Sequence, residues 1–101
     1  MSLNMNLINR GTEGELLLIG RLDSNTSADA EKVIDELTER FDDLILNMKD
    51  LDYISSAGLR ILKRAYMAMR RKGGSLKLKN VNRMVMEVFE VTGFAGLLQF
   101  I

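Results

Sequence analysis

The chain has 101 residues, of which 47% are hydrophobic and 28% are charged, and its 14 basic side chains balance 14 acidic ones. This composition predicts one globular domain over residues 1–101 and excludes a disordered chain. Zero net charge gives no general attraction to nucleic acid, and the lack of histidine and cysteine excludes zinc enzymes, Ser-His hydrolases and disulfide frameworks. We therefore expect no enzyme, no cofactor, no metal and no direct nucleic-acid binding.

The amino-terminal sequence MSLNMNLINR lacks the basic start and the apolar core of a signal peptide. No stretch reaches the roughly 20 apolar residues that a bilayer-spanning helix needs. A cytoplasmic protein without membrane insertion is the expectation.

The first half of the chain has the pattern of a hairpin, a helix and a strand. Partial alternation over Asn4–Asn9 and an apolar run over Glu15–Ile19 predict two strands, joined by a turn at Gly11–Gly14. Capping residues at Ser24–Ser27 then introduce a helix whose apolar positions recur at helical spacing: Ala30, Val33, Ile34, Leu37 and Phe41. The short apolar run Leu44–Met48 predicts a buried central strand.

The second half continues with two further helices and two strands. A helix is predicted from Ser56, with cations in its last turn and glycine just past its end at Arg70–Gly74. Lysines alternate with Leu76 and Leu78 as in a half-exposed strand. A helical pattern over Val81–Val91 precedes a last short strand within Leu97–Ile101.

The resulting order is strand, strand, helix, strand, helix, strand, helix, strand. An opening hairpin followed by alternating helices and strands requires a mixed β-sheet, with the helices packed mainly on one face. The predicted class is a single-domain α/β fold. The same hairpin argues against a response-regulator receiver, which begins with alternating strand and helix units.

The most informative segment is residues 50–59, DLDYISSAGL, between the central strand and the second helix. A hydroxyl of Ser55 or Ser56 at the helix start would cap a free backbone N–H and contribute about 1 kcal/mol to stability. The same helix start offers N–H donors and a partial positive charge to an anion such as a phosphoryl group. Small Ala57 and Gly58 would let a partner approach the backbone, although Gly58 suits tight helix packing equally well.

Residues Asp50–Leu62 resemble the signature of the STAS domain, specifically of the stand-alone anti-sigma factor antagonists of bacteria. Gly20–Asp23 followed by Thr26 is similar to the family's segment before its first helix. Gly73–Gly74 and Val91–Phe94 fall where the family has later turns. The resemblance covers nearly the whole chain and implies a STAS-like fold.

In that family an unphosphorylated antagonist binds an anti-sigma factor with a serine kinase fold and frees a sigma factor. The kinase ends the contact by phosphorylating the antagonist, and a phosphatase restores it. The resemblance places the phosphosite at Ser56, two residues before Gly58. Ser55, where the family commonly has aspartate, is a rival phosphosite. The implied partner-binding residues are Asp23, Ser55, Ser56, Ala57 and Gly58.

Other interpretations remain open at this point. STAS-like domains also occur as accessory subunits of lipid or anion transporters, which gives a second functional hypothesis. Asp23 suits a turn or a helix cap as well as a partner contact. An enzyme or nucleotide-binding protein is disfavoured, since the sequence has neither GxxxxGK nor GxGxxG.

Overall fold

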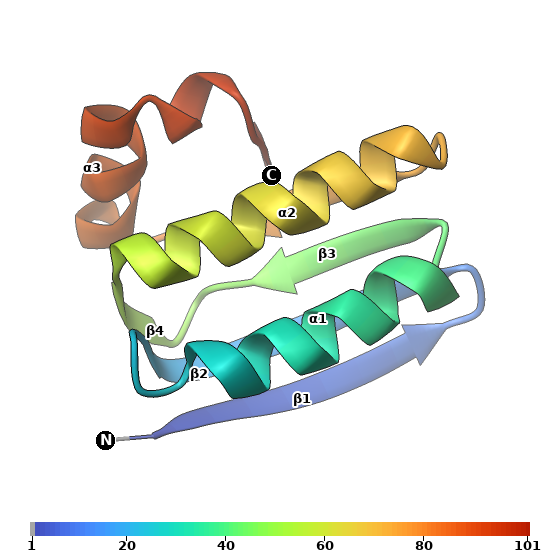
Figure 1. Cartoon of the computed structure of the whole chain (residues 1–101), viewed down its shortest axis with the longest axis horizontal. Coiled ribbons are helices and arrows are strands. Elements are labelled where there is room, and N and C mark those ends of the chain that lie inside the picture. Colours follow the sequence, from blue (N-terminus) through green and yellow to red (C-terminus); the bar gives the residue numbers. More distant parts are fainter. Residues whose placement is uncertain (1) are drawn as a thin grey trace.

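The computed structural model describes residues 2–101, which form one six-stranded mixed sheet and three α-helices. The strand order is β1-β2-β3-β5-β6, and β4 lies beside β2 (Figure 1). β1 and β2 are antiparallel, whereas the remaining pairs are parallel. The strands are β1 (Leu3–Arg10), β2 (Glu13–Leu22), β3 (Asp43–Asn47), β4 (Leu51–Ile54), β5 (Ser75–Lys79) and β6 (Gln99–Phe100). The predicted mixed α/β sheet is confirmed.

The opening hairpin is tighter than the sequence pattern indicated. Arg10 pairs directly with Glu13, so only two residues, Gly11 and Thr12, connect the strands. Gly11 has a φ of 82°, a left-handed conformation that glycine adopts without steric cost and that two-residue hairpin turns require. Both strands therefore extend beyond the predicted Asn4–Asn9 and Glu15–Ile19.

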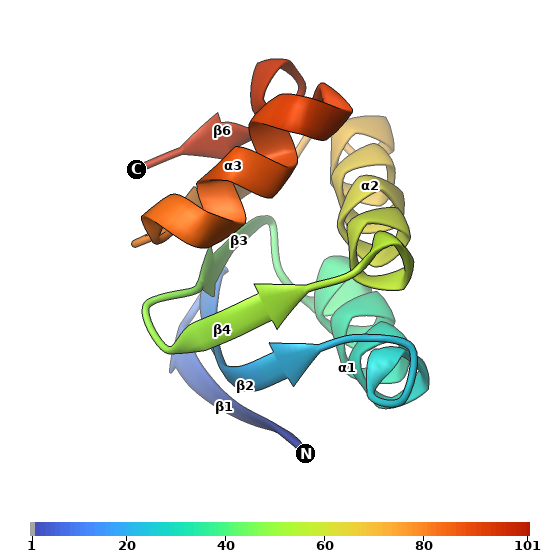
Figure 2. The ribbon, with the colours of Figure 1, turned by 90° about the vertical axis from the view of Figure 1, so that its left-hand side faces the viewer.

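The helices are α1 (Ser27–Arg40), α2 (Ser56–Arg71) and α3 (Arg83–Thr92). α1 and α2 lie side by side across one face of the sheet, and α3 packs near β4 and β6 (Figures 1 and 2). The Lys72 ammonium, just after α2, donates to the carbonyl oxygens of Thr38 and Phe41 at the end of α1, both at 2.9 Å. Helices packed mainly on one face were predicted, and the structure confirms this. Within residues 2–101, no helix combines the length and apolar character needed to cross a bilayer.

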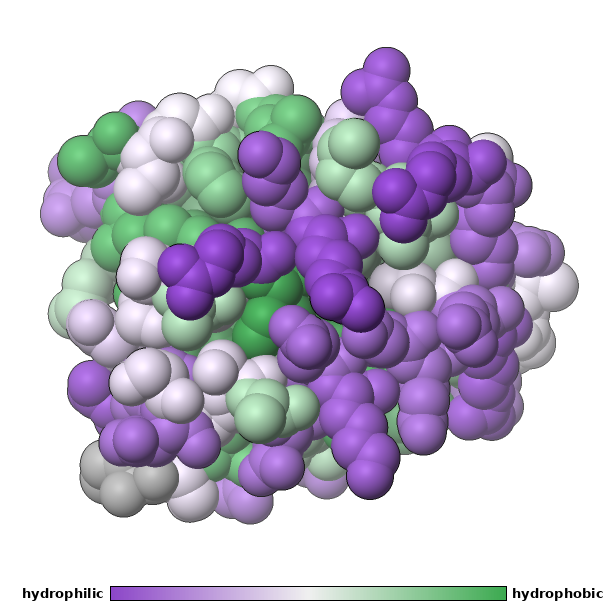
Figure 3. Space-filling model, in the orientation of Figure 1, coloured by the Kyte–Doolittle hydropathy of each residue, from purple (hydrophilic) through white to green (hydrophobic). Residues whose placement is uncertain are grey.

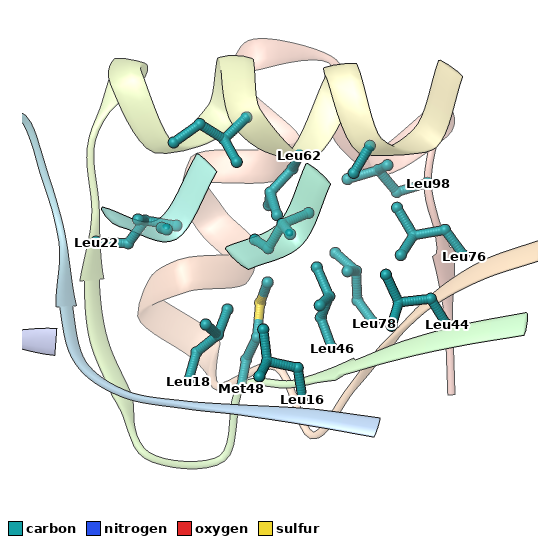
Figure 4. Packing of buried hydrophobic residues seen from close by; sticks show 14 of the residues in the cluster. Leu16, Leu18, Leu22, Leu44, Leu46, Met48, Leu62, Leu76, Leu78 and Leu98 are labelled. Atoms are coloured by element: carbon teal, nitrogen blue, oxygen red, sulfur yellow. The ribbon is translucent and has the colours of Figure 1, made fainter. Parts of the chain in front are cut away.

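The core lies between the sheet and these helices. Alternate leucines of β2, β3 and β5 point to the helix-covered face, and each is at most 3% exposed (Figure 4): Leu16, Leu18, Leu44, Leu46, Leu76 and Leu78. Ile34 of α1 and Leu62 of α2 meet them and are fully buried. Each such side chain contributes about 1.5–3 kcal/mol through removal of apolar surface from water.

β4 is an element that the sequence pattern did not predict. Its two buried residues, Leu51 and Ile54, flank two exposed ones, so the segment lacks the strict alternation of a half-buried strand. It forms because β2 is ten residues long, whereas β3 pairs only with its first half. β4 pairs with the remaining part of β2 after a register shift between Gly20 and Arg21.

Candidate protein-binding site

The predicted site residues gather where β2 and β4 end. These parallel strands point in the same direction, and their loops lead into α1 and α2 side by side (Figure 2). The Ser55 amide donates to the Leu22 carbonyl oxygen at 2.9 Å, which joins the two loops directly. Asp23 follows Leu22 in the chain and therefore lies beside the start of α2. One surface thus includes residues more than thirty positions apart in sequence.

The two adjacent serines have different environments. Ser55 is the N-cap of α2, and its hydroxyl oxygen accepts a long hydrogen bond of 3.5 Å from the Gly58 amide. Ser56 is the first helical residue and is exposed. Among the described residues, no hydrogen bond is made by the Ser56 hydroxyl. Ser55 therefore serves the helix, whereas the Ser56 hydroxyl faces solvent.

Asp23 organises the loop before α1. Its Oδ1 atom accepts hydrogen bonds from the Asn25 amide at 2.9 Å and the Thr26 amide at 3.2 Å. Burial raises the pKa of the Asp23 carboxyl, but these amides and the nearby Arg21 outweigh it and hold the pKa below its usual value. Asp23 therefore presents a fixed negative charge beside the start of α2 while it also shapes the turn.

Gly58 lies beneath this surface. A Cβ atom at this position would be 2.8 Å from the Leu22 Cγ atom and 2.8 Å from the Ile54 Cγ1 atom. Both distances are shorter than any ordinary carbon contact, so only glycine lets α2 pack this closely on β2 and β4. The structure thus supports the packing role of Gly58. Ala57 is half-buried and lines a shallow hollow between the starts of α1 and α2.

Arg21 and Tyr53 also belong to this surface, although the sequence pattern did not single them out as site residues. They are paired across β2 and β4, and the Arg21 guanidinium lies over the Tyr53 ring, 4.3 Å from its centroid. The Arg21 Nε atom is also 3.5 Å from a carboxylate oxygen of Asp23. The contact between Arg21 and Tyr53 depends on strand β4, which the sequence did not predict. The only sequence signal was that Arg21 precedes the buried Leu22, so that its side chain points to the other face of the strand.

Comparison with known protein families matches residues 7–101 to the STAS domain. This chain belongs to the STAS domain family. Curated relatives of this STAS domain include the anti-sigma-B factor antagonist of Bacillus subtilis (strain 168), 24% identical over 98 residues, which cover 97% of this chain and 90% of the relative. The anti-sigma F factor antagonist of Paenibacillus polymyxa is 30% identical over 78 residues, which cover 75% of this chain and 67% of the relative.

Solved structures share the STAS fold. An anti-sigma factor antagonist from Mycobacterium paratuberculosis superposes with a TM-score of 0.87 at 15% identity, covering 97% of this chain and 84% of that one. The anti-sigma factor antagonist SpoIIAA in its unphosphorylated form gives a TM-score of 0.75 at 16% identity, covering 98% of this chain and 86% of that one. At this level of identity the likeness establishes the fold alone.

The surface of the STAS domain near this site is partly apolar. Figure 3 shows hydrophobic residues gathered on the side where α3 and the start of α2 lie, whereas hydrophilic residues dominate the opposite side. Exposed apolar side chains of these elements include Tyr53 on β4 and Met84 on α3, which are 39% and 63% exposed. Within residues 2–101, no group of three His, Cys, Asp or Glu side chains is placed to hold a metal ion.

Proposed function

We propose that this protein is an anti-sigma factor antagonist that binds an anti-sigma factor through the surface around Ser56. The observation that carries the proposal is the exposed Ser56 hydroxyl in the first turn of α2, beside the loop in which backbone amides hold the Asp23 carboxylate. The names of the curated relatives support the same role. In this proposal the chain acts by binding in the cytoplasm and is not an enzyme.

Phosphorylation of Ser56 is proposed to end the interaction. A phosphate brings a charge of about −1.5 to −2 and three acceptor oxygens to a surface that the partner must cover. Repulsion from the Asp23 carboxylate adds to the cost of burying that charge. A structure of the same fold that is described as SpoIIAA in the phosphorylated form supports a role for this modification in the family.

Ser56 is proposed as the phosphosite in preference to Ser55. A kinase must reach the hydroxyl oxygen, and Ser56 is exposed whereas Ser55 is half-buried. Ser55 also accepts the capping hydrogen bond from Gly58, which phosphorylation would disturb. At Ser56 the phosphate would instead lie close to free N–H groups at the positive end of α2, so the helix tolerates it.

The proposed partner is an anti-sigma factor with a serine kinase fold, and a phosphatase returns the protein to its binding form. The partner surface comprises Asp23, Ser55, Ser56 and Ala57, with Gly58 supporting it from below. Arg21, Tyr53 and Met84 extend this surface toward β4 and α3. Exposed tyrosine, methionine and arginine side chains suit a protein partner, since these residue types are enriched at protein–protein interfaces.

The experiment is affinity capture from the source cell with wild-type, Ser56→Ala and Ser56→Asp protein as bait, followed by mass spectrometry. We expect wild type and Ser56→Ala to capture a kinase-fold protein that Ser56→Asp does not. Gln99→Glu is the matched control, because it adds the same charge at an exposed position in β6. Equal capture by Ser56→Asp, or capture of transporter subunits instead of a kinase-fold protein, would overturn the proposal.

A second measurement separates the two serines. The captured kinase-fold protein is incubated with ATP and with wild-type, Ser55→Ala or Ser56→Ala protein, and phosphate incorporation is located by peptide mass spectrometry. We expect incorporation into wild type and Ser55→Ala and none into Ser56→Ala. Phosphate on Ser55 in the Ser56→Ala variant would instead assign the site to Ser55.

A further inference from the structure

The outer edge of β1 is the long unpaired edge of the sheet. β1 stands at one end of the strand order and contains eight residues, six of them exposed. At the other end, β6 contains only two residues, and β4 is a four-residue strand with α3 packed against it. Figure 1 shows β1 running along the margin of the molecule with no helix beyond it.

Alternate residues of β1 direct their backbone groups away from β2. The Arg21 amide donates to the Ser2 carbonyl oxygen at 3.3 Å, and the pairing continues without a shift to Arg10 opposite Glu13. Because hydrogen-bonded pairs alternate along an antiparallel ladder, the even-numbered residues bond to β2. The odd-numbered residues from Leu3 to Asn9 therefore present their N–H and C=O groups to the outside.

This edge lacks the features that usually prevent strands from pairing between molecules. Such features include lysine, proline, a β-bulge or a covering segment. β1 has no lysine or proline and no shift of register, and its one charged residue, Arg10, stands at its end. Leu7 and Ile8, on opposite faces of the strand, are 38% and 39% exposed. A further strand would bury both.

We propose that β1 is a homodimer interface, in which it pairs antiparallel with β1 of a second copy of this chain to form one continuous sheet. A twofold axis at Asn6 gives the register in which the outward N–H and C=O groups of every odd-numbered residue from Leu3 to Asn9 form hydrogen bonds with the second copy. Met5 then lies opposite Leu7 of the second copy, and both side chains project from the helix-covered face. Because the pair is related by a twofold axis, the assembly closes as a dimer.

A second copy fits this edge electrostatically. In the proposed register Arg10 lies opposite Ser2 of the second copy, so no like charges face each other. The whole chain has a net charge of zero, which removes long-range repulsion between copies. Asn6 itself pairs with Leu17 in the middle of β2, so this interface does not include Ser56 or Asp23.

The test is sedimentation velocity over a concentration series, with charge-swap variants at the twofold axis. We expect wild type to dimerise with rising concentration, and Asn6→Lys or Asn6→Glu alone to raise the dissociation constant about fivefold through like charges facing each other. An equimolar mixture of the two variants should restore dimers, now as heterodimers. Gln99→Lys, which adds the same charge at β6, should dimerise like wild type.

A proline variant tests the backbone contribution. Leu7→Pro removes an outward-facing N–H and leaves the hydrogen bonds between β1 and β2 in place, so it should be monomeric with a wild-type circular dichroism spectrum. Wild type that stays monomeric at every concentration would overturn the proposal, as would Asn6 and Leu7 variants that dimerise unchanged. All of these variants should still capture the partner of the Ser56 surface, so the two proposals fail independently.

Discussion

Two polar regions of this domain differ in whether their side chains have hydrogen-bond or ion-pair partners within the fold. On the sheet face that α1 and α2 leave open, the Glu15 carboxylate is only 4% exposed and accepts hydrogen bonds from Arg10 at 2.6 Å and Asn47 at 2.9 Å. The Lys79 ammonium lies 3.8 Å away. At the start of α2, by contrast, the Ser56 hydroxyl is exposed and has no protein partner among the described residues.

This difference separates the structural role of Glu15 from the proposed binding role of Ser56. Glu15 connects β2 to partners on β1, β3 and β5, so its negative charge stabilises contacts between strands. The hydrogen bond from Arg10 is the largest cause that holds the pKa of Glu15 below its usual value, followed by that from Asn47, while burial opposes them. Ser56 contributes no comparable contact, and its chemistry is available to another molecule.

The largest expected effect comes from a change beneath the binding surface. Gly58→Val places side-chain atoms against Leu22 and Ile54, where even a Cβ atom is too close, and should lower the free energy of unfolding by about 3 kcal/mol. Urea denaturation measures the loss, and partner capture should fall with it. Gly96→Val is the control, since a Cβ atom at Gly96 meets nothing within 4 Å. Equal stability of the two variants would contradict the packing role of Gly58.

Glu15→Gln should affect stability and leave partner binding unchanged. Loss of a buried, charged hydrogen-bond acceptor is expected to cost about 2 kcal/mol at neutral pH. Because the folded state lowers the pKa of Glu15 below 4.5, its ionisation stabilises the fold above that value, and this contribution is lost as the pH falls through the lowered pKa. Urea denaturation should therefore show the difference between wild type and variant shrinking in acid.

Glu13→Gln is the matched control for this prediction. Glu13 also lies near Arg10, at 3.8 Å, but its side chain is 40% exposed, so water screens the pair. Its replacement should change stability by less than about 0.5 kcal/mol. A difference between wild type and Glu15→Gln that stays constant from neutral to acidic pH would show that the carboxylate charge is not what stabilises the cluster.

The same contrast explains what the sequence could predict. Helical spacing around Ile34 and over Val81–Val91, the end signals at Arg70–Gly74, and the alternation of Leu76 and Leu78 with lysines identified the helices and the mixed sheet. The spacing and the alternation reflect burial on one face, so they also indicated which face the helices cover. β4 was not predicted, because it is short, does not alternate, and forms only beside the second half of a long neighbouring strand. Its pairing with β2 is a tertiary contact that no local pattern contains.

The polar sites divide in a similar way. Residues 50–59 drew attention to the start of α2, but two adjacent serines are equivalent candidates for a cap until the helix boundary is known. In the structure Ser55 is the N-cap of α2 and Ser56 is exposed. Glu15 appeared only as the first residue of an apolar run, since its partners Asn47 and Lys79 are distant in sequence and meet it only in the folded sheet.

Ser55→Ala should have a smaller effect than the changes at Gly58 and Glu15. It removes the N-cap of α2, and because the capping hydrogen bond is long, at 3.5 Å, we expect a loss near the low end of the usual range, about 0.5–1 kcal/mol. Thermal denaturation followed by circular dichroism measures it. Ser24→Ala, at an exposed serine in the loop before α1, is the control and should leave the melting temperature unchanged. An equal loss in both variants would argue against a capping role for Ser55.

Ser56→Asp should have the smallest effect on stability and the largest effect on partner binding. The substitution removes no hydrogen bond within the described residues and adds a negative charge that the positive end of α2 favours, while the nearby Asp23 carboxylate opposes it. The free energy of unfolding should therefore change by less than about 0.5 kcal/mol. Urea denaturation and partner capture on the same preparation test both statements. If Ser56→Asp lost its helical circular dichroism signal, the negative charge would act by unfolding the domain, and the distinction between the paired Glu15 cluster and the exposed start of α2 would fail.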